Sequence, residues 1–287
     1  MEKEMFFDGF LSLLKPSVFW DGFLNGSVSS AEILVFILFA AIIFVFRYLI
    51  FSGLLYALTY FLPSGRKIQK AKSFTKTQIS REILYSLSTM PIYLLVFFGI
   101  LLMAKYGLNL AYMDIGKYGW GWFFLQMPIA LLFWDFYFYW MHRFIHHKTL
   151  YKRFHKVHHL STNPSPFSAI AFSQTEAVTE YIYFILLAML LPMNFYALLI
   201  VSSFGFLYSA YGHLGYEIMP KFIAKNSVGR LINSACHHNQ HHRTFKYNFG
   251  LYTVIWDRLF GTYHPEADSL VKEIQRSNLL TGSKSAV

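Results

Sequence analysis

Long apolar runs alternate with basic segments along this chain. The first run covers residues 31–62, with Glu32 at its edge and Arg47 inside it. A membrane-spanning helix needs about 20 predominantly apolar residues. This longer run therefore predicts one helix that leaves the membrane in its second half. Arg47 is then expected to extend its side chain to the membrane surface.

Two further apolar runs, 84–104 and 120–141, predict a second and a third spanning helix. The basic segment 63–82 precedes the second run, and its positive charges favour the cytoplasmic side of a membrane. The loop 105–119 has only two lysines as basic residues and is expected on the opposite side. The third run then returns the chain to the cytoplasm.

A fourth apolar stretch, 181–211, is broken in its middle by Pro192 and Asn194. It is long enough for two helices that enter and leave the membrane from one face. We therefore expect an all-α integral membrane protein with about three spanning helices, a helical hairpin and a cytoplasmic, histidine-rich helical cap. The expected single domain 1–287 has four parts: an interfacial segment (1–30), a transmembrane part (31–130), a histidine-rich part that carries the chemistry (131–265) and a tail (266–287).

Composition supports a lipid environment. Charged residues make up 14% of the chain, whereas soluble domains carry about 25%. The net charge of +10 lies in the segments between apolar runs, which favours a membrane surface and not nucleic acid as the partner. Cys236 is the only cysteine, so no disulfide forms within the chain. Without a Lys-Asp-Glu-Leu ending or a transit peptide, the bacterial inner membrane is favoured, with the endoplasmic reticulum as the alternative.

Most of the twelve histidines fall into three short clusters after the third apolar run. Members of a cluster are three or four residues apart: His142 and His146; His155, His158 and His159; His238, His241 and His242. Residues at this spacing share one face of a helix, so each cluster is expected to present its imidazoles in one direction. Imidazole is a good ligand for iron, zinc and copper. Eight imidazoles exceed the four ligands of a structural zinc, so two metal ions are the natural capacity.

Single residues outside the clusters complete the predicted site. His213 follows the fourth apolar stretch between small neighbours and is predicted as a further metal ligand. Neither the Glu-x-x-His pattern of soluble di-iron bundles nor the His-Glu-x-x-His signature of zinc proteases is present. Acids would instead accept ring N–H bonds from ligand histidines and fix their orientation. The candidates for this role are Asp135, Glu176 and Glu180.

The ordered clusters resemble those of the sterol desaturase and fatty acid hydroxylase superfamily. The flanking segments 140–143 (WMHR), 163–167 (NPSPF) and 256–262 (WDRLFGT) are similar as well. The resemblance runs from about residue 130 to 265. It departs from C-5 sterol desaturases in one place: Ser173 and Gln174 stand where those relatives carry a histidine followed by a proline.

This resemblance implies an integral membrane oxidoreductase with two non-haem iron ions and O₂ as co-substrate. Such enzymes hydroxylate or desaturate a C–H bond of a sterol or a fatty acyl chain. The histidines of the family map onto the eight cluster histidines, with His213 as an intervening ligand. The electrons would come from a separate cytochrome b5-like or ferredoxin-like protein with its reductase. Basic residues near the second cluster are candidates for docking an acidic carrier: Lys148, Lys152, Arg153 and Lys156.

Two other classes of protein also place histidines near a membrane. A metal transporter or storage protein would need them inside the spanning helices to form a path, but the clusters lie outside the predicted spans. A metal-dependent hydrolase would need an open metal position and a general base, such as Glu176 or Glu180. Consumption of O₂ coupled to a reductant separates an oxygenase from both.

Overall fold

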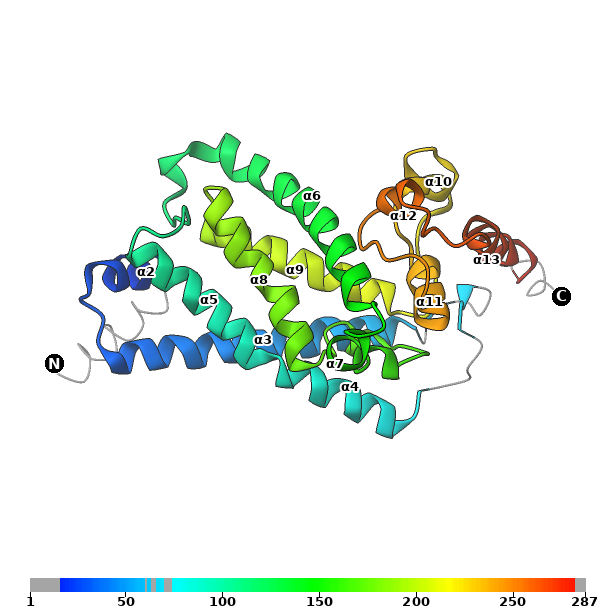
Figure 1. Cartoon of the computed structure of the whole chain (residues 1–287), viewed down its shortest axis with the longest axis horizontal. Helices are drawn as coiled ribbons and strands as arrows, with labels where there is room; N and C mark the ends of the chain where they lie inside the picture. The colour runs from blue at the N-terminus through cyan, green and yellow to red at the C-terminus, as the bar shows by residue number, and fades with distance from the viewer. Residues whose placement is uncertain (1–15, 60, 63–65, 70–73, 282–287) are drawn as a thin grey trace. The chain divides into compact units, whose positions relative to one another are not determined.

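The computed structural model describes residues 16–59, 61–62, 66–69 and 74–281 (Figure 1). Within this part of the chain the structure is helical, and pairing between extended segments is limited to isolated bridges. Half of the predicted interfacial segment lies outside the described residues, and α2 (Pro16–Asn25) forms in the other half. The chain divides into two compact units. Unit 1 comprises Met1–Arg47, Met90–Leu131 and Glu180–Ser203, and unit 2 comprises Tyr48–Thr89, Leu132–Thr179 and Phe204–Val287.

The first apolar run forms α3 (Ser30–Leu58), a helix that is apolar on all sides. Arg47 does not behave as predicted. Its Nη1 donates to the hydroxyl oxygens of Ser202, at 2.9 Å, and Ser203, at 3.2 Å. Two hydroxyls from a second apolar helix thus hold the guanidinium, so that it does not have to reach the membrane surface.

The second apolar run forms α4 (Lys76–Ser88) and α5 (Met90–Lys105). The structure corrects the predicted start, because α4 begins inside the basic segment 63–82. The Thr75 hydroxyl accepts a hydrogen bond from the Gln78 amide and caps the first turn. In unit 1, α5 packs against α2.

The third run forms α6 (Gly119–Ile145), and the hairpin forms as α8 (Gln174–Leu190) and α9 (Phe195–Gly212). The predicted break between α8 and α9 is well anchored. The Trp122 indole donates to the Pro192 carbonyl at 2.8 Å, and the Asn194 amide donates to the Met113 carbonyl at 2.9 Å. These two bonds connect the hairpin turn to the segments around Trp122 and Met113, and each of them satisfies a backbone carbonyl.

By length and composition, three stretches of the described residues could cross a membrane: α3, the Lys76–Lys105 stretch of α4 and α5, and α9. The number agrees with the prediction, but the identity of one helix does not. The predicted third span, α6, forms a helix of 27 residues but is not among the three. Gln126, Asp135 and His142 lie within α6, as do several tryptophans and tyrosines, and all of these lower its mean hydropathy.

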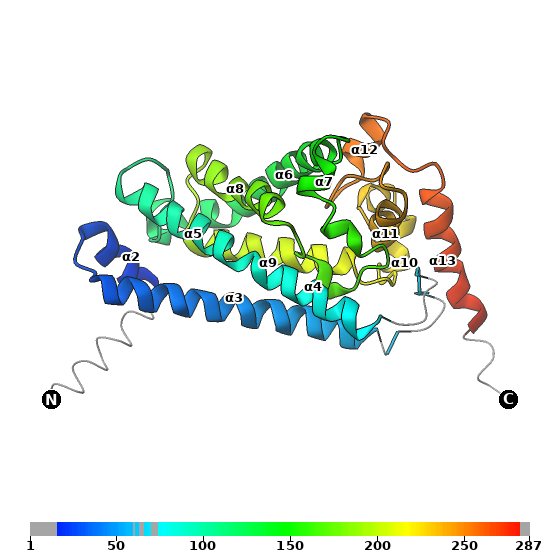
Figure 2. The ribbon, with the colours of Figure 1, turned by 60° about the horizontal axis from the view of Figure 1, so that its bottom comes forward.

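Unit 2 also contains the shorter helices that follow α6 and α9. They are α7 (Tyr151–Phe154), α10 (Lys221–Lys225), α11 (Ala235–Thr244), α12 (Ile255–Leu259) and α13 (Ala267–Thr281). The helix α11 packs against α13 (Figure 2), where Ala235, Cys236 and Ile274 share a small core. This packing buries one face of the helix that carries the third histidine cluster.

Candidate metal centre

The first histidine cluster lies at the carboxyl end of α6. His142 is in the last turn of the helix and has only 1% of its surface exposed. The His146 amide donates to the His142 carbonyl at 3.1 Å, which extends the helical path by one residue beyond Ile145. The predicted helical spacing therefore holds for this cluster, and both rings come from one face of α6.

The second cluster is not helical throughout, which corrects the prediction. His155 follows the end of α7, and His158 begins the short 3₁₀ helix η3 (His158–Leu160). The chain therefore turns inside this cluster, and the neighbouring rings of His158 and His159 point to different partners. Spacing alone did not distinguish this turn from a continuous helix.

The third cluster lies on α11, as predicted. Ser234 caps the helix through a reciprocal pair of hydrogen bonds with His237. Every residue from 235 to 242 is buried. His238 and His242 are one turn apart and share a face, whereas His241 points elsewhere.

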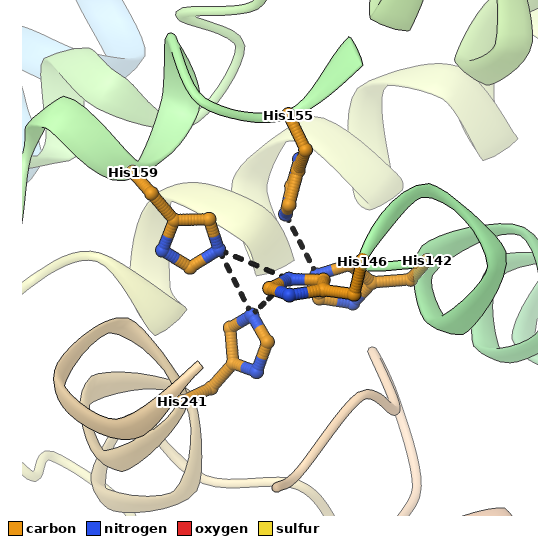
Figure 3. A group of neighbouring side chains, drawn as sticks. All are labelled: His142, His146, His155, His159 and His241. Atoms are coloured by element: carbon orange, nitrogen blue, oxygen red, sulfur yellow. Dashed lines mark hydrogen bonds between the residues drawn. The ribbon is translucent and has the colours of Figure 1, made fainter. Parts of the chain in front are cut away.

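All nine predicted ligand histidines lie in unit 2, where they form two groups. The first group consists of His142, His146, His155, His159 and His241 (Figure 3). The second group consists of His158, His213, His238 and His242. Within each group, one candidate ligand atom from every residue lies within 4.8 Å of the others. The expectation that each cluster faces one direction is wrong, because the second and third clusters each contribute to both groups.

The rings approach each other through their Nε2 atoms. In the first group the Nε2–Nε2 distances are 3.0 Å for His142–His155, 3.1 Å for His146–His241, 3.2 Å for His146–His159 and 3.1 Å for His159–His241. In the second group they are 3.2 Å for His158–His213, 3.1 Å for His213–His238 and 3.1 Å for His238–His242. Figure 3 shows the five rings of the first group converging from separate segments.

Acceptors on the opposite side of the rings determine which nitrogen carries hydrogen. The Nδ1 atoms of four histidines donate to backbone carbonyls: His142 to Phe249 at 2.8 Å, His213 to Ser209 at 2.6 Å, His241 to Tyr247 at 2.7 Å and His242 to Ser161 at 3.1 Å. A carbonyl can only accept, so Nδ1 holds the hydrogen of a neutral ring and Nε2 presents a lone pair.

Lone pairs that face each other at this distance repel, whereas a cation placed among them would be attracted to all. A metal–nitrogen bond of about 2.1 Å places adjacent nitrogens of an octahedral set about 3.0 Å apart, close to the spacings observed. Burial also lowers the pKa of His213 to about 4 and that of His241 to about 4. These rings are therefore neutral near pH 7, as ligation requires. The residues fit two metal ions.

Glu176 occupies the position that the sequence predicted for a supporting acid. It lies in the first turn of α8, fully buried, and its Oε1 accepts from His155 Nδ1 at 2.5 Å. A carboxylate in this position orients a ligand ring and raises its basicity. Glu180 lies one turn further along α8, in the part of the helix that belongs to unit 1, whereas the nine histidines are in unit 2. Its supporting role stays a prediction.

We expect Glu176→Gln to weaken metal binding about 10-fold to 100-fold, because it replaces the charged acceptor of the His155 ring. Competition with a chelator, followed by elemental analysis, measures this change. Glu266→Gln is the matched control, since Glu266 is exposed and lies outside both histidine groups. Equal metal retention in the two variants would mean that Glu176 does not support a ligand.

Asp135 has a different role from the predicted one. Its carboxylate accepts from the Tyr252 amide at 2.8 Å, from the Thr253 amide at 3.0 Å and hydroxyl at 2.6 Å, and from the Trp256 indole at 3.0 Å. These four bonds join α6 to residues 252–253, which lie between α11 and α12, and to Trp256 in α12. Asp135 therefore stabilises the loop around Phe249 and does not hold a ring directly.

Two further acids, which were not among the predicted site residues, support the site. Asp257 accepts from the amides of Phe249 and Gly250, both at 2.8 Å, and so positions the carbonyl that holds His142. Glu82, on α4, accepts from the Ser161 hydroxyl at 2.7 Å and also from Ser165. It thereby supports Ser161, whose carbonyl accepts from the Nδ1 of His242 in the second group. Neither acid lies three or four residues from a histidine, so the spacing pattern did not include them in the predicted site.

Comparisons with known proteins agree with this geometry. The fatty acid hydroxylase family matches residues 127–262. Mouse lathosterol oxidase is 30% identical over 213 residues, which cover 73% of this chain and 70% of that protein. A Delta(7)-sterol 5(6)-desaturase of Schizosaccharomyces pombe is 30% identical over 233 residues, with 81% and 74% covered. Human lathosterol oxidase is 28% identical over 208 residues, with 72% and 68% covered. No solved structure matches the chain.

Proposed function

Since this chain belongs to the sterol desaturase and fatty acid hydroxylase superfamily, we propose that its two histidine groups hold two iron ions that use O₂. The chain is a membrane oxidoreductase that hydroxylates or desaturates a C–H bond of a lipid. The metal transporter and the hydrolase are not favoured. The observation that carries the proposal is the convergence of Nε2 atoms in two groups of histidines, with ring hydrogens directed to acceptors outside each group.

The irons, when bound, supply the redox chemistry that activates O₂ and removes hydrogen from the substrate. The protein contributes neutral imidazoles, several of which are oriented by hydrogen bonds from their Nδ1 atoms to other protein groups. Glu176 holds the His155 ring, and backbone carbonyls hold four other rings. Eight of the nine rings are buried, so bulk water is kept away from the centre. Water exclusion protects reactive species from side reactions.

We propose a sterol as the substrate class. The matched relatives are named for oxidation of lathosterol or desaturation of Delta(7)-sterols. The departure from C-5 desaturases at residues 173 and 174 does not alter the ligand set. The Ser173 hydroxyl donates to the Phe154 carbonyl, and the Gln174 amide donates to the Ser88 carbonyl at 3.1 Å. Both side chains therefore bind scaffold segments of unit 2.

The same relatives also support a proposal for the membrane of residence. The sequence favoured the bacterial inner membrane, but the matched proteins reported above come from mouse, human and fission yeast. We therefore place the chain in the endoplasmic reticulum in preference to a bacterial inner membrane. The cytoplasmic position of the histidine cap stays a prediction from the charge of the loops.

A separate electron carrier would dock near the second histidine cluster. Four basic residues in this region are exposed: Lys148, Lys152, Arg153 and Lys156. A positive surface attracts an acidic carrier, and this attraction weakens with salt. We expect reduction of the metal centre by such a carrier to slow severalfold between low ionic strength and about 0.5 M salt. A rate independent of salt, measured by stopped-flow spectroscopy, would argue against docking here.

Metal analysis of the purified full-length protein tests the function. We expect close to two irons per chain, a coupled Mössbauer spectrum from iron-57-enriched protein, and O₂ consumption that depends on a reductant and on lathosterol. Protein with bound zinc would first be reconstituted with iron. A folded protein that binds no metal, or that hydrolyses a substrate without consuming O₂, would refute the proposal.

A further inference from the structure

An apolar pocket of about 440 Å³ lies within unit 1. The nine predicted ligand histidines belong to unit 2. The walls of the pocket come from α2, α3, α5 and α9, and include Phe36, Ile43, Leu94, Phe98 and Leu199. The volume lies within the range of about 300–1,000 Å³ that is typical of small-molecule sites. The α3 and α5 walls belong to stretches that could cross a membrane, so the natural occupant is a hydrocarbon.

Among the described residues that line this pocket, Arg47 is the only charged one. Its guanidinium lies over the rings of Phe44, at 5.7 Å, and Tyr93, at 5.3 Å. Its Nη1 donates to Ser202 and Ser203, as described above. The hydroxyls accept hydrogen bonds from the guanidinium and the rings attract its charge, but neither carries a negative charge. No carboxylate among the described residues forms an ion pair with Arg47.

An arginine inside an apolar span is costly and marks a functional site by default. The bonds to the serines occupy Nη1 alone, and neither Nε nor Nη2 is hydrogen-bonded to a described residue. These two N–H groups form one edge of the guanidinium fork, which matches the two oxygens of a carboxylate. Along α3, the lining runs from Phe36 to Arg47, or about 16 Å at 1.5 Å per residue.

We propose that this pocket binds a fatty acid, with its hydrocarbon chain along α3 and its carboxylate paired with Arg47. One apolar pocket with one cation matches one hydrocarbon chain with one anionic end. A sterol would leave the charge of Arg47 uncompensated, and a phospholipid would bring a second hydrocarbon chain. The site is separate from the ligand histidines in sequence and lies in the other unit, so the inference does not rest on the proposed oxidation.

Equilibrium binding of radiolabelled palmitate to the full-length protein in nonionic detergent tests this site. We expect saturable binding of one palmitate per chain, with weak competition by hexadecanol, which has the same chain but no charge. Arg47→Gln should lower the affinity about tenfold or more, because a charge-assisted bidentate pair is lost. Ala40→Phe, which fills the pocket and leaves Arg47 in place, should lower it as well.

Lys117→Gln is the matched control. It removes one positive charge from unit 1 at an exposed residue outside the lining of this pocket, and should bind palmitate within about twofold of the native protein. Circular dichroism and metal content verify that each variant is folded. Equal competition by hexadecanol and palmitate, or by cholesterol and palmitate, would overturn the proposal. So would unchanged palmitate affinity in the folded Ala40→Phe protein, even if Arg47→Gln failed to fold.

Discussion

Replacement of His158 by alanine is expected to abolish lipid oxidation and to reduce the metal content from two ions per chain to one or fewer. His158 belongs to the smaller group, which has four histidines. Its Nε2 lies 3.2 Å from that of His213, and its side chain is buried. Loss of this ring leaves three candidate ligands and an internal space. Since even loss of a supporting residue lowers affinity about 10-fold to 100-fold, turnover should fall by more than about 100-fold.

Elemental analysis and reductant-dependent O₂ consumption measure these two effects on the same preparation. His147→Ala is the matched control, because its Nδ1 contacts the Thr149 hydroxyl at the surface and its ring is in neither group. The control should retain two ions and its activity. If His158→Ala kept both metal and turnover, the assignment of the second group as a metal site would be wrong.

Replacement of Asp135 by alanine is expected to cause the largest loss of stability among single substitutions near the site. It removes the acceptor of four hydrogen bonds and leaves two backbone amides, a hydroxyl and an indole N–H without it. An unsatisfied buried donor costs about 1–3 kcal/mol. Part of this cost is relieved by rearrangement, so we expect a loss of about 3–5 kcal/mol and a melting temperature lower by roughly 10 °C.

Thermal unfolding followed by circular dichroism in detergent measures the loss. Asp135→Asn keeps the size of the side chain but offers only one acceptor oxygen, and should fall between the native protein and the alanine variant. Asp21→Ala, at an exposed position of α2, should stay within about 0.5 kcal/mol of native stability. An Asp135→Ala protein as stable as Asp21→Ala would show that the four bonds contribute little.

The sequence predicted the helices well where apolar character and length were sufficient. The nine histidines predicted as ligands all belong to the two groups, but their division between the groups was not predicted, since the α11 cluster contributes to both. The turn inside the second cluster was missed, since His155, His158 and His159 have the same spacing in a helix and in the observed α7–η3 segment. The same sequence spacing can therefore place the rings in one group or in two, depending on whether the backbone stays helical.

The supporting residues were harder to predict than the candidate ligands. Backbone carbonyls such as that of Phe249 have no sequence signature, because every residue has one. Asp135 shares a helical face with His142, but the tertiary fold directs its carboxylate to Tyr252 and Thr253. Glu176 was a candidate because it is one of the acids close to the histidine clusters in the sequence, and in the structure its carboxylate accepts from His155.

Adjacent residues serve different groups at two places in unit 2. His158 and His159 are neighbours in the chain, as are His241 and His242, and the members of each pair belong to opposite groups. A metal that orders one member restricts the backbone of the other, so the entropy of ordering is shared between the two sites. Loading should therefore be cooperative, and protein with a single ion should be scarce during titration. Because of this linkage, a substitution that disturbs the histidines of one site is expected to disturb the other site as well.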